Sequence, residues 1–290
     1  MTTNQLQGLT LALIGSGTMA RGIIHALLDS GEVSPEQIIA GDPLTEQRQT
    51  LQTNYGVRVT ADNTVAVGEA DVIILSVKPQ VLPTVLDELH GSVRPGALVL
   101  SIVAGMSIAT ISAGLAHPAV VRTMPNTPAQ IGEGMTVWTA APAVSETQHA
   151  QARVILQAMG KEMYVHHEDA LDMATAVSGT GPTYVFLLME ALVDAAVHLG
   201  FSRREARLLV IQTVLGSVKF AQQSDLHLAQ LRNMVTSPGG TSAEAIYQME
   251  KGSLRTVLSK GVWAAYQKSR LLGKRAQEPL EAPLKVDNTG

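Results

Sequence analysis

The chain has 290 residues, 46% of them hydrophobic, which is enough to bury the cores of two domains and argues against global disorder. Its formal net charge of −4, from 21 basic and 25 acidic side chains, provides no electrostatic footprint for nucleic acid or an anionic membrane. The absence of cysteine excludes disulfides, thiolate nucleophiles and cysteine metal sites, and it fits a reducing compartment.

The N-terminal sequence MTTNQLQGLT has no basic region of the kind that begins a secretory signal. We expect no apolar run of membrane-spanning length. These features predict a cytoplasmic protein whose partners include neither a membrane nor nucleic acid.

Short apolar runs alternate with helical stretches along residues 1–166. The runs that are typical of strands are 9–15, 37–42, 57–60, 70–77, 97–103, 119–125, 135–140 and 161–166. The stretches with helical periodicity are 18–31, 45–55, 79–91 and 145–160. Strands that alternate with helices imply a parallel sheet with helices on both faces, so residues 1–166 are expected to form an α/β domain.

The pattern becomes helical over residues 167–275, with long apolar stretches at 173–200, 202–223 and 252–274. We therefore expect an all-α second domain, followed by a flexible tail at 276–290. The stretch 173–200 is apolar on nearly every face, so it is expected to pack against a second subunit. A central helix within one monomer remains the alternative.

The sequence GSGTMA at 15–20 follows the first strand and begins the first helix, as a dinucleotide-binding turn does. Gly15 would make the tight turn, Gly17 would let the pyrophosphate approach, and Ala20 would let the helix pack near the strand. Thr18 and Met19 complete the predicted cofactor-binding residues of this turn.

Asp42 ends the second predicted strand, where an acidic residue holds the ribose 2′-hydroxyl and would repel a 2′-phosphate. Arg48, further along the next helix, could neutralise that phosphate. Asp42 could also simply cap the helix that follows Pro43. The choice between NADH and NADPH therefore stays open.

Three further loops follow predicted strands and should meet the cofactor, because ligands of open α/β sheets bind at the carboxyl ends of strands. They are SVKP at 76–79, VAGMS at 103–107 and RTMPNTP at 122–128. Ala104 would leave room for a flat ring, and the amide of Asn126 could reach a carboxamide or a ribose.

The sequence MVTSPGGTSAEAI at 234–246 combines hydroxyl side chains and paired glycines at the start of a helical pattern. A helix that begins with free N–H groups and hydroxyls can bind an anion. An ordinary capped loop between two helices is the alternative.

These motifs together resemble the pyrroline-5-carboxylate reductase family. The resemblance runs from LALIGSGTMA through SVKPQ, VRTMPNTPAQIGEG and AVSGTGPTYVFLLMEALVDAA to MVTSPGGTSAEAI, roughly residues 9 to 270. It implies an NAD(P)H-dependent oxidoreductase that reduces pyrroline-5-carboxylate to proline, the last step of proline biosynthesis. It also implies a Rossmann-like N-terminal domain and an all-α C-terminal dimerisation domain that interlocks two subunits. Such homodimers often assemble into ring-like oligomers.

The resemblance also assigns the substrate site. Ser237 and the backbone N–H groups of Gly240, Thr241 and Ser242 would hold the substrate carboxylate. The family usually has Thr at position 242, whose hydroxyl is proposed to bond the ring nitrogen, so Ser242 is the expected catalytic residue. Asn233 replaces a more usual Asp.

Further family positions concern the cofactor. Thr175 matches the residue that touches the nicotinamide amide, and Asn63 and Lys78 fall at cofactor positions. Hydride transfer to a readily protonated imine is mainly a matter of positioning and needs no metal. We therefore expect no metal site, and the adjacent His166, His167 and Glu168 are expected to be linker residues.

Two alternatives were weighed against the reductase. A 3-hydroxyacid dehydrogenase of similar architecture would place a catalytic Lys on the long helix of the second domain, and residues 173–200 contain no Lys. A non-catalytic dinucleotide-binding sensor would need no substrate loop. The intact SPGGTS sequence argues against it, and cofactor binding without turnover would favour it.

Overall fold

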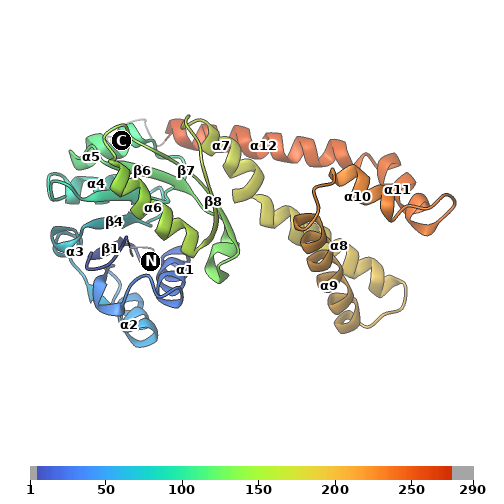
Figure 1. Ribbon diagram of the computed structural model, residues 1–290, viewed down its shortest axis with the longest axis horizontal. Helices are drawn as coiled ribbons and strands as arrows, with labels where there is room; N and C mark the ends of the chain where they lie inside the picture. The colour runs from blue at the N-terminus through green and yellow to red at the C-terminus, as the bar shows by residue number, and fades with distance from the viewer. Residues whose placement is uncertain (1–4, 276–290) are drawn as a thin grey trace, which may run out of the picture. The chain divides into compact units, whose positions relative to one another are not determined.

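The computed structural model describes residues 5–275, whose elements are labelled in Figure 1. Contacts between Cα atoms divide the chain into two compact units. Unit 1 is the chain up to Gly179 together with the stretch from Ala265 onward, and unit 2 is Thr180–Ala264. The change of unit thus lies later in the chain than the division expected at residue 166. The segment 276–290, predicted as a flexible tail, lies outside the described residues.

Unit 1 is built on one eight-stranded sheet with the order β3-β2-β1-β4-β5-β6-β7-β8. Its strands are β1 (Leu11–Ile14), β2 (Ile38–Gly41), β3 (Arg58–Thr60), β4 (Val72–Leu75), β5 (Leu98–Ser101), β6 (Val120–Met124), β7 (Gly134–Ala140) and β8 (Gly160–Tyr164). Every residue of β1, β2, β4 and β5 is buried, as expected for strands covered on both faces.

The sheet is not parallel throughout, which corrects the sequence-based expectation. β7 pairs with β6 in the antiparallel sense, and β8 pairs with β7 in the parallel sense. The connection from β6 to β7, residues 125–133, contains only the 3₁₀ turn η2 (Thr127–Ile131). A parallel crossover needs a dozen or more residues, so this connection is too short and the chain reverses.

Helices cover both faces of the sheet (Figure 1). The helices of unit 1 are α1 (Thr18–Asp29), α2 (Thr45–Tyr55), α3 (Asn63–Glu69), α4 (Leu82–Leu89), α5 (Ile108–Leu115), α6 (Glu146–Ala158) and α7 (Ala170–Ala174), with a 3₁₀ turn η1 (Pro35–Gln37). Alternate strand residues enter two separate cores. Leu11 and Leu13 pack with α1, α2 and α6, while Ala12 and Ile14 pack with α3, α4 and α5.

The short helices α3 and α5 were missed by the sequence analysis. Both are rich in β-branched residues and glycine, which weakens helical propensity. Side chains at their starts compensate. Asp62 accepts the N–H of Thr64 and Ser107 accepts the N–H of Thr110. The hydroxyl and then the backbone N–H of Thr64 hold the pKa of Asp62 below its usual range.

The stretch predicted as one helix over 173–200 is interrupted. A π-helical turn, η3 (Thr175–Gly179), separates α7 from α8 (Gly181–His198). The hydroxyls of Thr175 and Ser178 donate to carbonyl oxygens four residues earlier, at 2.7 and 3.1 Å. A Cβ on Gly179 would lie 2.9 Å from the Cε of Met124, so the backbone passes close to β6 here. Turns of this kind often occur at functional sites.

Unit 2 is entirely helical in the described residues, as expected. It contains α8, α9 (Arg203–Gln222), α10 (Leu228–Met234), α11 (Thr241–Lys251) and the first part of α12 (Leu254–Arg275), which continues into unit 1. Helices α8, α10 and α11 have no buried residue, and α9 buries only Ala206 and Val210. Large apolar side chains are exposed instead, including Phe186, Leu187 and Leu208. Exposed apolar surface on this scale indicates a protein interface.

One described segment, Ala170–His198, is long and apolar enough to cross a membrane by length and composition. This corrects the expectation that no run reaches that length. The same criterion is met by helices that pack inside soluble assemblies, so the segment alone is weak evidence for a membrane span.

A charge on the exposed face of α9 tests whether another subunit covers it. Leu208 is 71% exposed within the chain, and Ile131 on η2 is 76% exposed. Leu208→Glu is expected to lower the melting temperature by roughly 5–10 °C and to reduce the mass in solution, because an unpaired charge in an interface is costly. Ile131→Glu is the matched control. Light scattering and thermal unfolding measure both effects, and equal, unchanged values in the two variants would contradict the interface.

Candidate functional site

The carboxyl ends of β1, β2 and β4 border a cleft of about 600 Å³ in unit 1. The residues predicted to bind cofactor that line this cleft are Gly15, Gly17, Thr18, Asp42, Asn63 and Lys78. Met19 lies on α1 but packs against the core. The lining also includes Ser16 and Ser76, which belong to the predicted segments 15–20 and 76–79, and three residues that the sequence analysis missed, namely Arg21, Gln47 and Glu88.

The glycine-rich turn is built as the sequence predicted. Gly15 has φ +94°, and a Cβ there would lie 2.8 Å from Cγ1 of Val77, so glycine is needed for both conformation and space. The hydroxyl of Ser76 donates to the Gly15 carbonyl at 2.8 Å and holds the turn. Gly17 is the N-cap residue of α1, and nothing lies within 4 Å of a Cβ placed on it. Open space therefore faces the start of α1.

The start of α1 can hold an anion. No side chain caps the helix, and no acidic residue lies in its first turn. Its first N–H groups therefore stay available, and the helix dipole favours negative charge at this end. A pyrophosphate fits this arrangement, as in other dinucleotide-binding turns.

Asp42 joins two of the loops around the cleft. Its Oδ2 accepts the Ser16 N–H at 3.0 Å and the Ser16 hydroxyl at 2.6 Å. Its Oδ1 accepts the Leu44 N–H at 2.8 Å. Because α2 has Leu44 as N-cap residue and no side-chain cap, Asp42 closes a turn and does not cap that helix. The carboxylate keeps a place on the cleft wall.

Arg48 is held against the same turn. Its Nη1 donates to the carbonyls of Asp42 and Pro43 at 2.7 and 2.9 Å, and its Nη2 donates to the Thr45 hydroxyl at 3.0 Å. Arg21 of α1 bonds to the side chain of Gln47 and to the Ser16 carbonyl. Two guanidinium groups thus bond to the backbone of the loops that Asp42 joins.

Asn63 contributes an orphaned polar atom. Its Oδ1 is buried and has no hydrogen-bond partner in the described chain, while its Nδ2 donates to Oε2 of Glu88 at 3.0 Å. A Cβ on Gly41 would collide with that oxygen, so glycine at the end of β2 makes room for the amide. A buried acceptor without a partner is costly, and a ligand hydroxyl would satisfy it. The lining therefore fits a dinucleotide.

Three other predicted cofactor residues do not line this cleft. Ala104 is half-buried on the loop after β5. The Asn126 amide bonds within the protein, since its Oδ1 accepts the Met135 N–H at 2.9 Å and its Nδ2 donates to the Ser178 carbonyl at 3.2 Å. The Thr175 hydroxyl donates to the Leu171 carbonyl at 2.7 Å. Their roles toward a nicotinamide remain predictions.

The predicted substrate residues gather at the start of α11 in unit 2. Gly240 is the N-cap residue, and its N–H donates to the Ser237 carbonyl at 3.0 Å. A Cβ on Gly240 would lie 2.5 Å from the Ser237 hydroxyl, so any other residue would push that hydroxyl away from its present position. Among the described residues, no acceptor is bonded to the N–H groups of Thr241 or Ser242.

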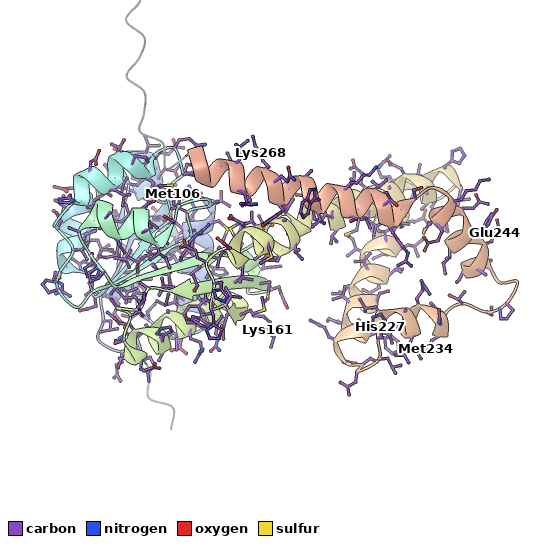
Figure 2. All side chains as sticks on the ribbon, turned by 90° about the horizontal axis from the view of Figure 1, so that it is seen from above. Met106, Lys161, His227, Met234, Glu244 and Lys268 are labelled. Atoms are coloured by element: carbon purple, nitrogen blue, oxygen red, sulfur yellow. The ribbon has the colours of Figure 1, made fainter. Side chains whose placement is uncertain are left out.

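One acidic side chain lies in the helical turn that follows this loop. Glu244 lies in the first turn of α11, and Figure 2 labels it together with Met234 of α10 and His227, the N-cap residue of that helix. Its Oε1 accepts the Gln248 amide at 2.9 Å. The loop thus offers two free backbone N–H groups and the hydroxyls of three residues, Ser237, Thr241 and Ser242. This group is suited to a carboxylate.

The residues considered for a metal site have other roles. Oε1 of Glu168 accepts a hydrogen bond from Nη1 of Arg122 at 2.8 Å, and the ring of His166 packs edge to face against that of Tyr164. Within residues 5–275, no three His, Cys, Asp or Glu side chains are grouped so that they could hold a metal ion.

Two protein-family models match separate parts of the chain. The model described as "Pyrroline-5-carboxylate reductase dimerisation" matches residues 168–272. The model described as "NADP oxidoreductase coenzyme F420-dependent" matches residues 10–105. The first covers the all-α part of the chain and the second covers most of the Rossmann-like sheet, so the predicted fold class is confirmed.

Curated relatives match nearly the whole chain. The pyrroline-5-carboxylate reductase of Synechocystis is 43% identical over 91% of this chain and 98% of its own, and that of Pseudomonas aeruginosa is 40% identical over 91% and 97%.

Solved structures agree with these relatives. The pyrroline-5-carboxylate reductase of Coxiella burnetii superposes with a TM-score of 0.85 at 36% identity, over 91% of this chain and 98% of its own. The pyrroline carboxylate reductase of Plasmodium falciparum, solved with NADP bound, gives 0.84 at 30% identity, over 92% and 99%. Similarity of this extent shows that the chain belongs to the pyrroline-5-carboxylate reductase family.

Proposed function

We propose that the chain reduces the cyclic imine of L-1-pyrroline-5-carboxylate to L-proline by hydride transfer from NADPH or NADH, the last step of proline biosynthesis. The observation that carries this proposal is the near full-length similarity to curated reductases. The cleft of unit 1 and the start of α11 supply the two anion sites that such a reaction requires.

The cofactor is held by backbone groups and by a few side chains. The first N–H groups of α1 hold the pyrophosphate, and the Gly17 position lets it approach. Asp42 and Asn63 face ribose hydroxyls, while Lys78 supplies positive charge on the cleft wall. Bound NADPH or NADH supplies the hydride. We assign the Ala104 loop, Asn126 and Thr175 to the surroundings of the nicotinamide, beyond the lining of this cleft.

The substrate is held through its carboxylate. Ser237 and the N–H groups of Gly240, Thr241 and Ser242 were predicted to bind it, and the Gly240 N–H is already bonded to Ser237. We therefore assign the carboxylate to the N–H groups of Thr241 and Ser242 and to the Ser237 hydroxyl. The Ser242 hydroxyl donates to the lone pair that forms on the ring nitrogen as hydride adds to the neighbouring carbon. The protonated imine is electrophilic, so the protein's main task is to align its carbon with the nicotinamide.

The dimerisation domain indicates a homodimer or a larger oligomer. We propose a homodimer as the basic assembly, because the helices of unit 2 expose apolar faces that one copy leaves uncovered. Further assembly into a ring remains part of the proposal. So does a cytoplasmic location without membrane contact, since the segment Ala170–His198 lies entirely within the dimerisation match.

Removing the Ser242 hydroxyl tests the reaction and the loop together. Ser242→Ala is expected to lower kcat about 10²-fold, since a donor that acts on the developing amine is lost. Ser242→Thr, the family's usual residue, should retain activity. Steady-state assays of coenzyme oxidation with pyrroline-5-carboxylate and either coenzyme measure the effect.

Thr236→Val is the matched control for Ser242→Ala. The Thr236 hydroxyl donates to the Arg232 carbonyl at 2.7 Å and precedes the loop. This variant should keep a near-normal kcat. Coenzyme binding with no reduction by the wild type would contradict the proposed function and favour a dinucleotide-binding sensor.

The charge of Asp42 is expected to oppose a 2′-phosphate. Asp42→Asn removes the charge from the cleft wall and keeps one of the two acceptor oxygens, which can serve the Ser16 N–H or the Leu44 N–H but not both. The ratio of kcat/KM for NADPH to that for NADH should rise about tenfold or more, because like charges a few ångströms apart repel by about 1–4 kcal/mol. Calorimetric titration of each coenzyme provides a second measurement.

The control for Asp42→Asn removes one negative charge from α1, away from the cleft. Asp29→Asn changes an exposed carboxylate at the far end of α1. It should leave the coenzyme ratio as in the wild type. If both variants keep that ratio, the Asp42 carboxylate does not face the 2′ position.

A further inference from the structure

A buried arginine in unit 1 bonds to two carboxylates that no proposed catalytic step uses. The Arg122 side chain, on β6, is 9% exposed. Its Nη1 lies 2.8 Å from Oε1 of Glu168, and its Nη2 lies 3.8 Å from Oδ1 of Asp172. A buried ion pair is weak evidence for stability, because desolvation offsets much of the attraction. Its geometry is therefore the more informative property.

Each carboxylate of this network also accepts a hydrogen bond from another element. Oε1 of Glu168 accepts the N–H of Ile108, the first residue of α5, at 2.9 Å. Oδ1 of Asp172 accepts the hydroxyl of Ser269, on α12, at 2.8 Å. Ser269 is buried, although most residues of α12 are exposed. The network therefore connects the last turns of α12 with the start of α5.

The loop 103–107 lies directly before α5 and is held from two sides. Val103 and Met106 are buried in the core. On the other side, a Cβ on Gly273 of α12 would lie 3.1 Å from the Gly105 carbonyl oxygen, and one on Gly105, at φ +76°, would lie 3.2 Å from the Gly273 N. Figure 2 labels Met106 on this loop and Lys268, which precedes Ser269 on α12. Backbone thus packs directly on backbone.

We propose that the last turns of α12 are a positioning element for the loop 103–107, which carries Ala104 toward the nicotinamide. Ser269, Asp172, Arg122 and Glu168 act as positioning residues, and Gly273 provides the contact surface. This inference rests on the proposed function for the orientation of Ala104. It adds that the segment assigned to dimerisation also sets the geometry of the nicotinamide loop.

The physical argument concerns the freedom of the loop. Loop 103–107 connects β5 to α5, and Gly105 gives its backbone access to the left-handed region. Without α12, its buried side chains, the bond from the Val103 N–H to the Ser101 hydroxyl and the start of α5 would restrain it. The nicotinamide must align its reactive carbon with the substrate. Small displacements of loop 103–107, against which the ring packs, would therefore disturb that alignment.

The first test removes the hydroxyl that ties α12 to the network. For Ser269→Ala we expect the dissociation constant of the coenzyme, NADH or NADPH, to rise about tenfold, because a charge-assisted hydrogen bond is lost. Binding of the matching ADP-ribose, which lacks the nicotinamide, should stay within twofold. Calorimetry without substrate measures both ligands on the full-length oligomer. Ser269→Thr retains the hydroxyl and should restore coenzyme affinity.

The control for Ser269→Ala is Ser217→Ala. The Ser217 hydroxyl donates to the Thr213 carbonyl of its own helix, α9, at 2.8 Å. This variant should bind both ligands as the wild type does. Equal loss of coenzyme and ADP-ribose affinity in Ser269→Ala, or a lower melting temperature with unchanged affinities, would overturn the inference.

The second test changes the glycine contact while raising helical propensity. Gly273→Ala and Gly68→Ala each place a methyl group on a helix, which favours the helix by about the same amount in both. The methyl at 273 meets the Gly105 carbonyl at 3.1 Å, whereas nothing lies within 4 Å at 68. We expect the coenzyme KM to rise severalfold in Gly273→Ala, with little change in the substrate KM, and to stay unchanged in Gly68→Ala.

The two proposals fail in different ways. A wild type that binds coenzyme but reduces no pyrroline-5-carboxylate contradicts the proposed function, and the binding comparison can still be made. If Gly273→Ala and Ser269→Ala both bind coenzyme as the wild type does, the positioning role of α12 is wrong and the reaction assignment is unaffected.

Discussion

Two helices of this chain begin on a glycine that provides no side-chain cap, and both proposed anion sites depend on this. Gly17 precedes α1 and Gly240 precedes α11. By contrast, Asp62, Ser107, Ser145 and Ser202 cap α3, α5, α6 and α9 with their side chains. An uncapped start leaves N–H groups for a ligand. A chain with a net charge of −4 can in this way bind a pyrophosphate and a carboxylate without a basic patch.

The uncapped start of α1 lies at the edge of the sheet where several strands end. Because β2, β1 and β4 are parallel neighbours, their carboxyl ends meet at one edge. Two side chains then tie the loops that leave it. Asp42, after β2, bonds to Ser16, after β1. Ser76, after β4, bonds to the carbonyls of Ile14 and Gly15 at the end of β1. Restrained loops of this kind bind a ligand at a lower entropic cost.

The helical part of the chain bears on both assembly and cofactor geometry. Its exposed apolar faces require a covering partner, which agrees with the dimerisation domain matched over residues 168–272. Its last helix, α12, also ends against the Rossmann-like unit, through Ser269 and Gly273. Assembly and cofactor geometry therefore share one helix. A substitution in α12 that disturbs assembly is therefore expected to disturb the cofactor geometry as well.

The sequence by itself determined the features that depend on neighbouring residues. The buried strands, the Gly15–Gly17 turn and the glycine pair before Thr241 follow from hydrophobic periodicity and from backbone conformations that only glycine adopts easily. Long-range contacts decided the rest. The reversal at β7 depends on where the short connection returns to the sheet, and the π-turn at Thr175–Gly179 coincides with the close approach of Gly179 to Met124. The bonds of Asp42 to Ser16, of Asn126 to Met135 and Ser178, and of Arg122 to Glu168 join residues between 9 and 52 positions apart. No local pattern encodes such pairs, because packing of the whole unit brings them together.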